Sequence, residues 1–112
     1  MRKLLTPGTK IIKSKVLAKA ISRNDSLVIE VMKRAAFTVG DACVSLRHIF
    51  DPQVIVLGGG VMGACGDFIL PLVQARLAKD KFFSKLGKCE LVLSQLEDNA
   101  TILGAVALAR EI

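Results

Sequence analysis

Apolar residues in the middle of the chain recur at steps of three and four from Leu27 to Phe50. This spacing predicts one long amphipathic helix with a wide buried face. The segment 24–26 precedes it as a break that recaps the chain, and Asp51-Pro52 ends it. A shorter helix is predicted before it, with Ser14 as its cap and an apolar face made by Val16, Leu17, Ala20 and Ile21.

Two residues interrupt the helical patterns. Gly40 lies inside the long helix and lowers its stability by ~1 kcal/mol relative to alanine, unless another backbone packs close to it. A third helix is predicted to begin several residues after the glycines at 58–60, with an apolar face made by Phe68, Ile69, Leu72, Val73 and Leu77. Pro71 must lie in the first turn of that helix or at a kink, because proline cannot donate an interior hydrogen bond.

Two short runs predict strands. Residues 53–57 are apolar after Gln53 and show no alternation, which predicts a strand covered on both faces, as in a parallel sheet. Residues 89–93 are the second candidate. The order is therefore helix, long helix, strand, helix, strand, helix, a helix-rich α/β arrangement with a short right-handed parallel unit. Two strands make a poor sheet, so the chain either completes a sheet elsewhere or is one half of a larger fold.

A final helix is expected over residues 100–110, where small and apolar residues predominate. Asp98 or Asn99 is expected to cap it. Leu103, Ala107 and the other small residues of this segment are expected to face inward. Taken alone, the pattern predicts an ordinary, well-packed terminal helix.

Composition narrows the class of protein. The chain has 112 residues, 52% of them hydrophobic, so we expect a folded core in a single domain or in a piece of a larger one. No apolar run approaches the ~20 residues needed to cross a bilayer, so we expect neither a membrane span nor a membrane partner.

The net charge of +6 is concentrated before Asp25, the first acidic residue, in Arg2, Lys3, Lys10, Lys13, Lys15, Lys19 and Arg23. Such a stretch can attract a polyanion. It has no aromatic stacking residue, however, and it is too short for a helix-turn-helix. A solvated face, or a surface matched to acidic residues elsewhere, is therefore favoured over nucleic-acid binding.

The thiols and the single histidine indicate structural roles. Cys43, Cys65 and Cys89 are widely spaced, without a Cys-x-x-Cys pair, and each lies among small or apolar residues. They are interpreted as buried thiols in a reducing cytosol. His48 has no second ligand at metal spacing and is expected near a helix end, where a cation suits the dipole.

Three consecutive glycines, Gly58, Gly59 and Gly60, follow the first predicted strand. Glycine admits positive φ and lets a ligand or another backbone approach the main chain. In open α/β sheets the ligand crevice lies beyond the carboxyl ends of the strands, where this turn falls. A tight strand-to-helix turn with close packing and no ligand explains the same residues. On the turn alone, the ligand-binding and the structural interpretation are equally supported.

The same turn satisfies Gly-x-Gly-x-x-Gly through Gly58, Gly60 and Gly63, a weak match to a dinucleotide fingerprint. That fingerprint requires a helix that opens on the glycines, whereas the helical pattern here begins later. It also requires an acidic residue about 20 positions on, at the end of the next strand. Asp80 has the distance but lies between helix and strand, so a nicotinamide-cofactor protein is the lesser interpretation.

Two segments make the chain resemble a known family. Residues 50–61, Phe-Asp-Pro-Gln-Val-Ile-Val-Leu-Gly-Gly-Gly-Val, and residues 96–109, Leu-Glu-Asp-Asn-Ala-Thr-Ile-Leu-Gly-Ala-Val-Ala-Leu-Ala, are similar in sequence and spacing to the adenosine-side turn and the late small-residue helix of ROK proteins (repressor, open reading frame, kinase). The two upstream helices fit the same register. The likeness covers about residues 14–111.

The resemblance implies an actin-like ATPase fold, of the ribonuclease H-like type, with ATP bound between two α/β lobes. It implies that Gly58, Gly59, Gly60 and Val61 lie against the adenosine. It also implies that the Gly104-Ala105 helix is one of two crossing helices that connect the lobes and hinge their closure. The whole chain, residues 1–112, is then a single domain from the carboxy-terminal lobe.

The resemblance implies a cytoplasmic sugar kinase that transfers the γ-phosphate of ATP, with Mg²⁺, to a hexose-type hydroxyl. The family's amino-terminal phosphate loop, its catalytic aspartate and its His/Cys zinc cluster have no match in this chain, so we expect no catalytic residue and no metal ligand here. We do not assign the role of the catalytic aspartate to Asp41, Asp51 or Asp67. We expect the chain to bind ATP or ADP, to meet sugar only through the missing part, and to form a homo-oligomer.

Two alternatives remain open at this stage. ROK-type repressors keep the sugar-binding fold and add an amino-terminal DNA-binding segment, so the chain is also compatible with a fragment of such a repressor. A free-standing interaction protein that kept half of an old kinase would bury its open surface by self-association.

Overall fold

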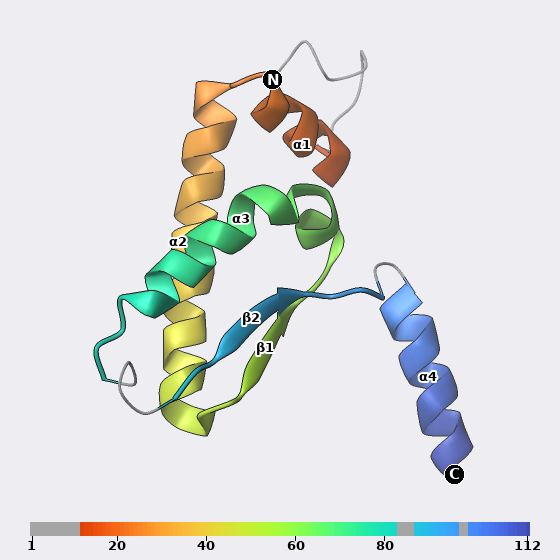
Figure 1. Ribbon diagram of the computed structural model, residues 1–112. Helices are drawn as coiled ribbons and strands as arrows, with labels where there is room; N and C mark the ends of the chain where they lie inside the picture. Colours follow the sequence, from red (N-terminus) through yellow and green to blue (C-terminus); the bar gives the residue numbers. More distant parts are fainter. Residues whose placement is uncertain (1–11, 83–86, 97–98) are drawn as a thin grey trace.

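The computed structural model describes residues 12–82, 87–96 and 99–112. Within them the elements follow the predicted order: α1 (Ser14–Ser22), α2 (Ser26–Phe50), β1 (Val54–Leu57), α3 (Gly60–Ala78), β2 (Glu90–Leu93) and α4 (Ala100–Glu111) (Figure 1). The basic residues Arg2, Lys3 and Lys10 and the proposed cap Asp98 lie outside the described residues.

The long helix α2 has the predicted limits. The side chain of Asp25 accepts a hydrogen bond from the backbone N–H of Val28 at 3.2 Å and so caps its first turn. Asp51 ends it with a left-handed conformation, φ 46°. The prediction for α1 was wrong by one position: Lys13 precedes the helix and Ser14 is already its first residue.

The core lies mainly between α2 and α3, which cross in contact (Figure 1). Gly40 lies at this crossing: a Cβ added there would lie 2.7 Å from both Cβ and Cγ of Arg76. This close approach explains why a glycine is tolerated in the middle of a long helix. The buried apolar side chains come mainly from α2 and α3, with one each from α1 and β2: Ala20, Val28, Met32, Ala36, Cys43, Cys65, Ile69, Val73, Leu77 and Leu91.

Helix α3 differs from the prediction at its beginning. It opens at Gly60, directly on the glycines, and the N–H of Gly63 donates to the carbonyl of Gly59 at 2.9 Å. The first turns contain glycine, alanine and other short side chains, which carry little amphipathic pattern, so the helix could not be seen there. Pro71 consequently lies in the helix interior, not in its first turn, and Asp67 lies well inside the helix.

By length and composition alone, α3 is also apolar enough to cross a bilayer. Its side chains do not suit that role, because Asp67 and Arg76 are charged and Ile69, Val73 and Leu77 are buried in the protein core. These contacts are those of a core helix.

The two strands pair in parallel, with Val54 beside Glu90 and Leu57 beside Leu93. Leu91 is buried and Ile55 is half-buried on the face toward the helices. Val54 and Val56 are 47% and 60% exposed on the other face. The expectation of a strand covered on both faces is therefore wrong for the described part of the chain, where the helices cover one face only.

Helix α4 stands apart from the other elements in Figure 1. Every residue of it is exposed, and Leu103 is 48% exposed. The prediction that Leu103 and Ala107 face inward was wrong, because the helix is apolar on several sides and no described element covers any of them. Asn99 precedes the helix but makes no side-chain capping bond.

Candidate functional site

The glycine turn joins the carboxyl end of β1 to the start of α3. Gly59 precedes the helix with φ 107° and ψ 171°. This combination lies in a region that essentially only glycine occupies. The second of the three glycines is therefore required by the backbone of the turn itself.

The carboxyl end of β2 closes the turn from the side. The N–H of Ser94 donates to the carbonyl of Leu57 at 2.8 Å and carries the sheet pairing one residue further. A Cβ added to Gly58 would lie 3.3 Å from Cβ of Ser94. A side chain at position 58 would therefore fill the space between the two strand ends, and glycine keeps that space open.

A small cleft of about 160 Å³ lies at this joint end of the strands, lined by Leu57, Gly58, Gly59, Met62, Gly63, Leu93 and Ser94. The structure thus brings Gly58 and Gly59 together with residues of α3 and β2. Gly60 and Val61 lie beside the cleft and outside its lining, and Val61 is 43% exposed.

Met62 and Ser94 were missed by the sequence analysis. A general signal for Ser94 existed, because the residue after the second of two parallel strands lies beside the turn after the first. Met62 carried no such signal, since the start of α3 was predicted too late.

The chemistry available at the cleft is that of binding. Its walls are aliphatic side chains and glycine backbone, beside the amino-terminal end of a helix with no acidic residue in its first turn. Such an end favours anions and polar acceptors. The lining contains no ionisable side chain, so these residues can hold a ligand but cannot supply a general acid or base.

Gly104 and Ala105 are not brought to this cleft. Both lie on the exposed α4, and a Cβ added to Gly104 would meet no atom within 4 Å. The resemblance implied that these two residues lie where two helices cross. Among the described residues, no second helix crosses α4 at this point.

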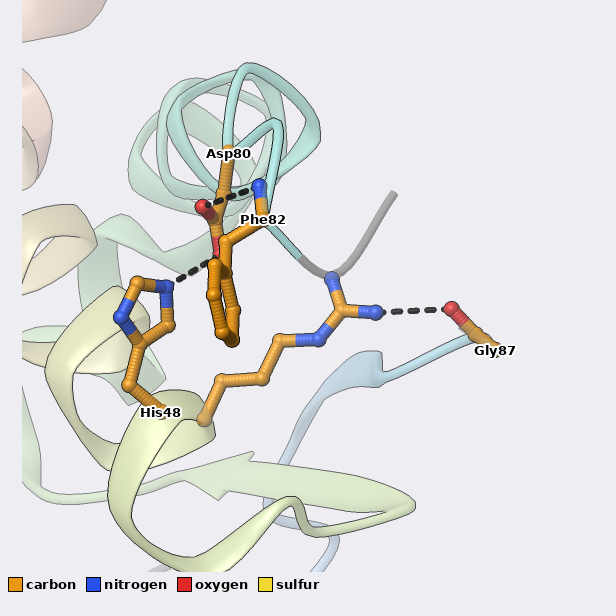
Figure 2. Close-up of polar contacts among 5 residues, drawn as sticks. His48, Asp80, Phe82 and Gly87 are labelled. Atoms are coloured by element: carbon orange, nitrogen blue, oxygen red, sulfur yellow. Dashed lines mark hydrogen bonds and ion pairs between the residues drawn. The ribbon is translucent and has the colours of Figure 1, made fainter. Parts of the chain in front are cut away.

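A second and larger hollow, about 500 Å³, lies at the opposite end of the strands, lined by Arg47, Gln74, Leu77, Ala78, Asp80, residues 87–89 and residues 90–92. Figure 2 shows the side chains next to it. Nε2 of His48 lies 2.8 Å from the carboxylate of Asp80, and the guanidinium of Arg47 donates to the carbonyl of Gly87 at 2.7 Å. His48 and Phe82 have their rings 5.2 Å apart.

Asp80 is only 7% exposed, and this cluster sets its acidity. Burial raises the pKa of the Asp80 carboxyl, but the hydrogen bonds from His48 and from the N–H of Phe82, with the charges of His48 and Arg47, lower it further, so the net shift is downward. The carboxylate therefore joins the end of α2 to the turn after α3. Asp80 lies at the end of the strands opposite to the glycine cleft, too far to contact a ribose bound there. It therefore cannot serve as the acidic residue that a dinucleotide fingerprint requires.

The aspartate and the cysteines that the sequence offered as candidates have structural roles in the fold. Asp41 accepts from Nε of Arg76 at 2.7 Å across the α2–α3 contact. Cys43 and Cys65 are buried as predicted, and burial raises the pKa of both thiols. Cys89 is only half-buried, so the prediction of a buried thiol was wrong there. Among the described residues no group of three or more His, Cys, Asp or Glu side chains is placed to hold a metal ion.

The chain is similar to known proteins in sequence and in fold. The sequence pattern of the ROK family matches residues 1–112. The chain is 28% identical over 98 residues to the glucokinase of Thermotoga maritima, a match that covers 88% of this chain and 31% of that protein. It superposes with a TM-score of 0.76, at 24% identity, on the crystal structure of a protein from Cytophaga hutchinsonii provisionally assigned as a sugar kinase, covering 92% of this chain and 34% of that one.

The parallel strand–helix–strand unit and this superposition define the class: the chain has the fold of part of an actin-like ATPase lobe. The chain belongs to the ROK family. It spans about a third of the length of the two relatives it matches.

Proposed function

We propose that this chain is the carboxy-terminal, adenosine-binding portion of an ATP-dependent sugar kinase, which transfers a phosphoryl group from ATP to a hexose-type hydroxyl. The observation that supports it is the cleft at the joint end of β1 and β2. Gly58 and Gly59 line it, and a Cβ added at position 58 would lie 3.3 Å from Cβ of Ser94, another lining residue. The sugar-kinase relatives supply the class of reaction.

The residues of the cleft suit the base and ribose of a nucleotide. Aliphatic walls and bare glycine backbone allow a flat ring to lie against the main chain, and Gly60 and Val61 flank the entrance. Phosphoryl transfer also requires groups that hold the triphosphate and Mg²⁺ and an aspartate that orients the attacking hydroxyl. In this proposal those groups belong to the remainder of the kinase, as does the sugar site.

The remaining features follow from the same proposal. Residues 1–112 form a single carboxy-terminal domain of a cytoplasmic enzyme. The Gly104-Ala105 segment of α4 is the helix that crosses a second helix between the lobes, where glycine and alanine permit close approach. The uncovered apolar residues of α4 and of the sheet are buried in the complete kinase and its homo-oligomer.

The test is nucleotide binding by the chain itself. We expect ADP to shift the backbone amide NMR signals of residues 58–63 and of Ser94. Gly58→Val should weaken ADP binding at least about tenfold, because the added side chain fills the cleft. Ala42→Val, on an exposed position of α2, is the matched control and should bind ADP as the natural chain does.

Two results would contradict the proposal. ADP shifts spread over α2 and the 500 Å³ hollow, with none at the glycine turn, would place the ligand elsewhere. Robust ATP-dependent phosphorylation of hexoses or N-acetylhexosamines by this chain alone would show that it is more than the adenosine-binding portion.

A further inference from the structure

The cleft contains one polar side chain, that of Ser94. Its other lining residues are glycines and the apolar Leu57, Met62 and Leu93. A nucleoside has hydrogen-bonding groups on both base and ribose, and a buried acceptor left without a donor weakens binding. Among the described residues that line this cleft, Ser94 is therefore the one whose side chain can recognise such groups.

Ser94 is held in place from two sides. Its backbone N–H donates to the carbonyl of Leu57 at 2.8 Å, which ties it to the end of β1. Its Oγ accepts from the N–H of Leu96 at 3.3 Å, which ties it to the segment that follows. Because Oγ acts as an acceptor in that bond, its hydrogen can be donated to another group.

The size of the cleft limits what this hydroxyl can meet. Sites for whole small molecules have volumes of roughly 300–1,000 Å³, whereas this cleft has about 160 Å³. It has room for one part of a nucleotide, next to the glycine backbone. A single hydroxyl in so small a space has a large share in deciding which part fits.

We propose that Ser94 contacts the nucleoside: its hydroxyl donates a hydrogen bond to one acceptor on the base or ribose of the bound nucleotide. This inference rests on the adenosine-binding function proposed above, and it assigns the polar contact of that site to a residue of β2's carboxyl end rather than to the glycine turn.

The first experiment compares ADP binding by the natural chain and by Ser94→Ala, measured by calorimetry or NMR titration. Loss of one neutral hydrogen bond predicts binding weaker by roughly three- to tenfold. Ser45→Ala, on the exposed surface of α2, is the matched control and should not change binding.

A second experiment separates direct contact from a merely structural role, because Ser94→Ala also removes the bond from Leu96. ADP analogues that each lack one acceptor of the base or ribose are titrated against both chains. If Ser94 contacts the nucleoside, its substitution should have no further effect on the one analogue that lacks its partner.

The outcomes distinguish the two proposals. An equal loss with every analogue, or no loss with ADP, would overturn the role of Ser94 while leaving the adenosine site intact. Failure of the natural chain to bind ADP would instead overturn the adenosine site, and the role of Ser94 with it.

Discussion

Single residues fix the connections at both ends of the strands. At one end Gly59 takes a conformation that other residues avoid, and at the other Asp80 joins α2 to the turn after α3. These positions differ in how their effect depends on conditions. The geometry of Gly59 is independent of pH, whereas the contribution of Asp80 follows the charge of its carboxyl.

Asp80→Asn should lower the thermal unfolding midpoint at neutral pH. The neutral amide cannot replace the charged carboxylate that contacts His48 and lies near the positive charge of Arg47. The folded-state pKa of Asp80 lies below its ordinary 3.8. Its stabilisation is therefore fully present above the unfolded-state pKa and is lost as the pH falls through the lower, folded-state pKa. The difference between the two chains should shrink as the pH falls below 3.8 and through the lower, folded-state pKa of Asp80, measured by circular dichroism melts from pH 2 to 8.

The exposed Asp67 of α3 provides the control, since Asp67→Asn removes a carboxylate without touching the His48 contact. A midpoint difference for Asp80→Asn that persists unchanged at pH 2 would show that the carboxylate's charge does not matter there.

At this scale the sequence predicted residues whose role is local. The recapping of the chain at residues 24–26, the end of the long helix at Asp51 and the helix-end position of His48 all depend on neighbours within a few positions. The contact of Asp80 with His48 could not be predicted, because the two residues lie 32 positions apart and only the fold brings them together.

Among the elements, α2 and α3 form the main contact, and Gly40 decides how closely they approach. Gly40→Ala should lower the free energy of unfolding by up to about 2 kcal/mol. Overlap of the new methyl group with Cβ and Cγ of Arg76 costs about 1–3 kcal/mol, and the higher helix propensity of alanine offsets about 1 kcal/mol of that cost. Urea unfolding followed by circular dichroism measures the change.

Gly63→Ala is the matched substitution, since Gly63 also lies inside a helix but an added Cβ there meets no atom within 4 Å. It should raise the free energy of unfolding by about 0.4–1 kcal/mol. Equal effects of the two substitutions would mean that helix propensity alone, and not the crossing, controls stability.

The elements themselves were predictable in kind and order, since apolar periodicity reports which face of a helix is buried. The beginning of α3 could not be predicted, because three glycines and an alanine among its first seven residues interrupt the apolar periodicity. The exposure of α4 could not be predicted either, because an apolar helix shows the same pattern whether its partner lies in this chain or in another part of the protein.

For the whole molecule, α4 is the element that the rest of the described chain does not need. Ending the chain after Leu96 should change the free energy of unfolding by less than about 1 kcal/mol, because α4 has no buried side chain. It should also reduce self-association, measured by sedimentation velocity, because Ile102, Leu103, Val106 and Leu108 are removed from the surface.

Ending the chain before β2, after Lys88, is the contrasting variant. It removes the partner of β1 and the buried Leu91, so cooperative unfolding should be lost. If the chain that ends after Leu96 also lost cooperative unfolding, α4 would be an integral part of the core.

The parallel pairing of β1 and β2 has a consequence for the order of events during synthesis. The floor of the cleft at Gly58 and Gly59 leaves the ribosome well before its far wall at Leu93 and Ser94, and a parallel partner can join only after the intervening helix has been made. A nascent chain therefore lacks this cleft until Leu93 and Ser94 have emerged.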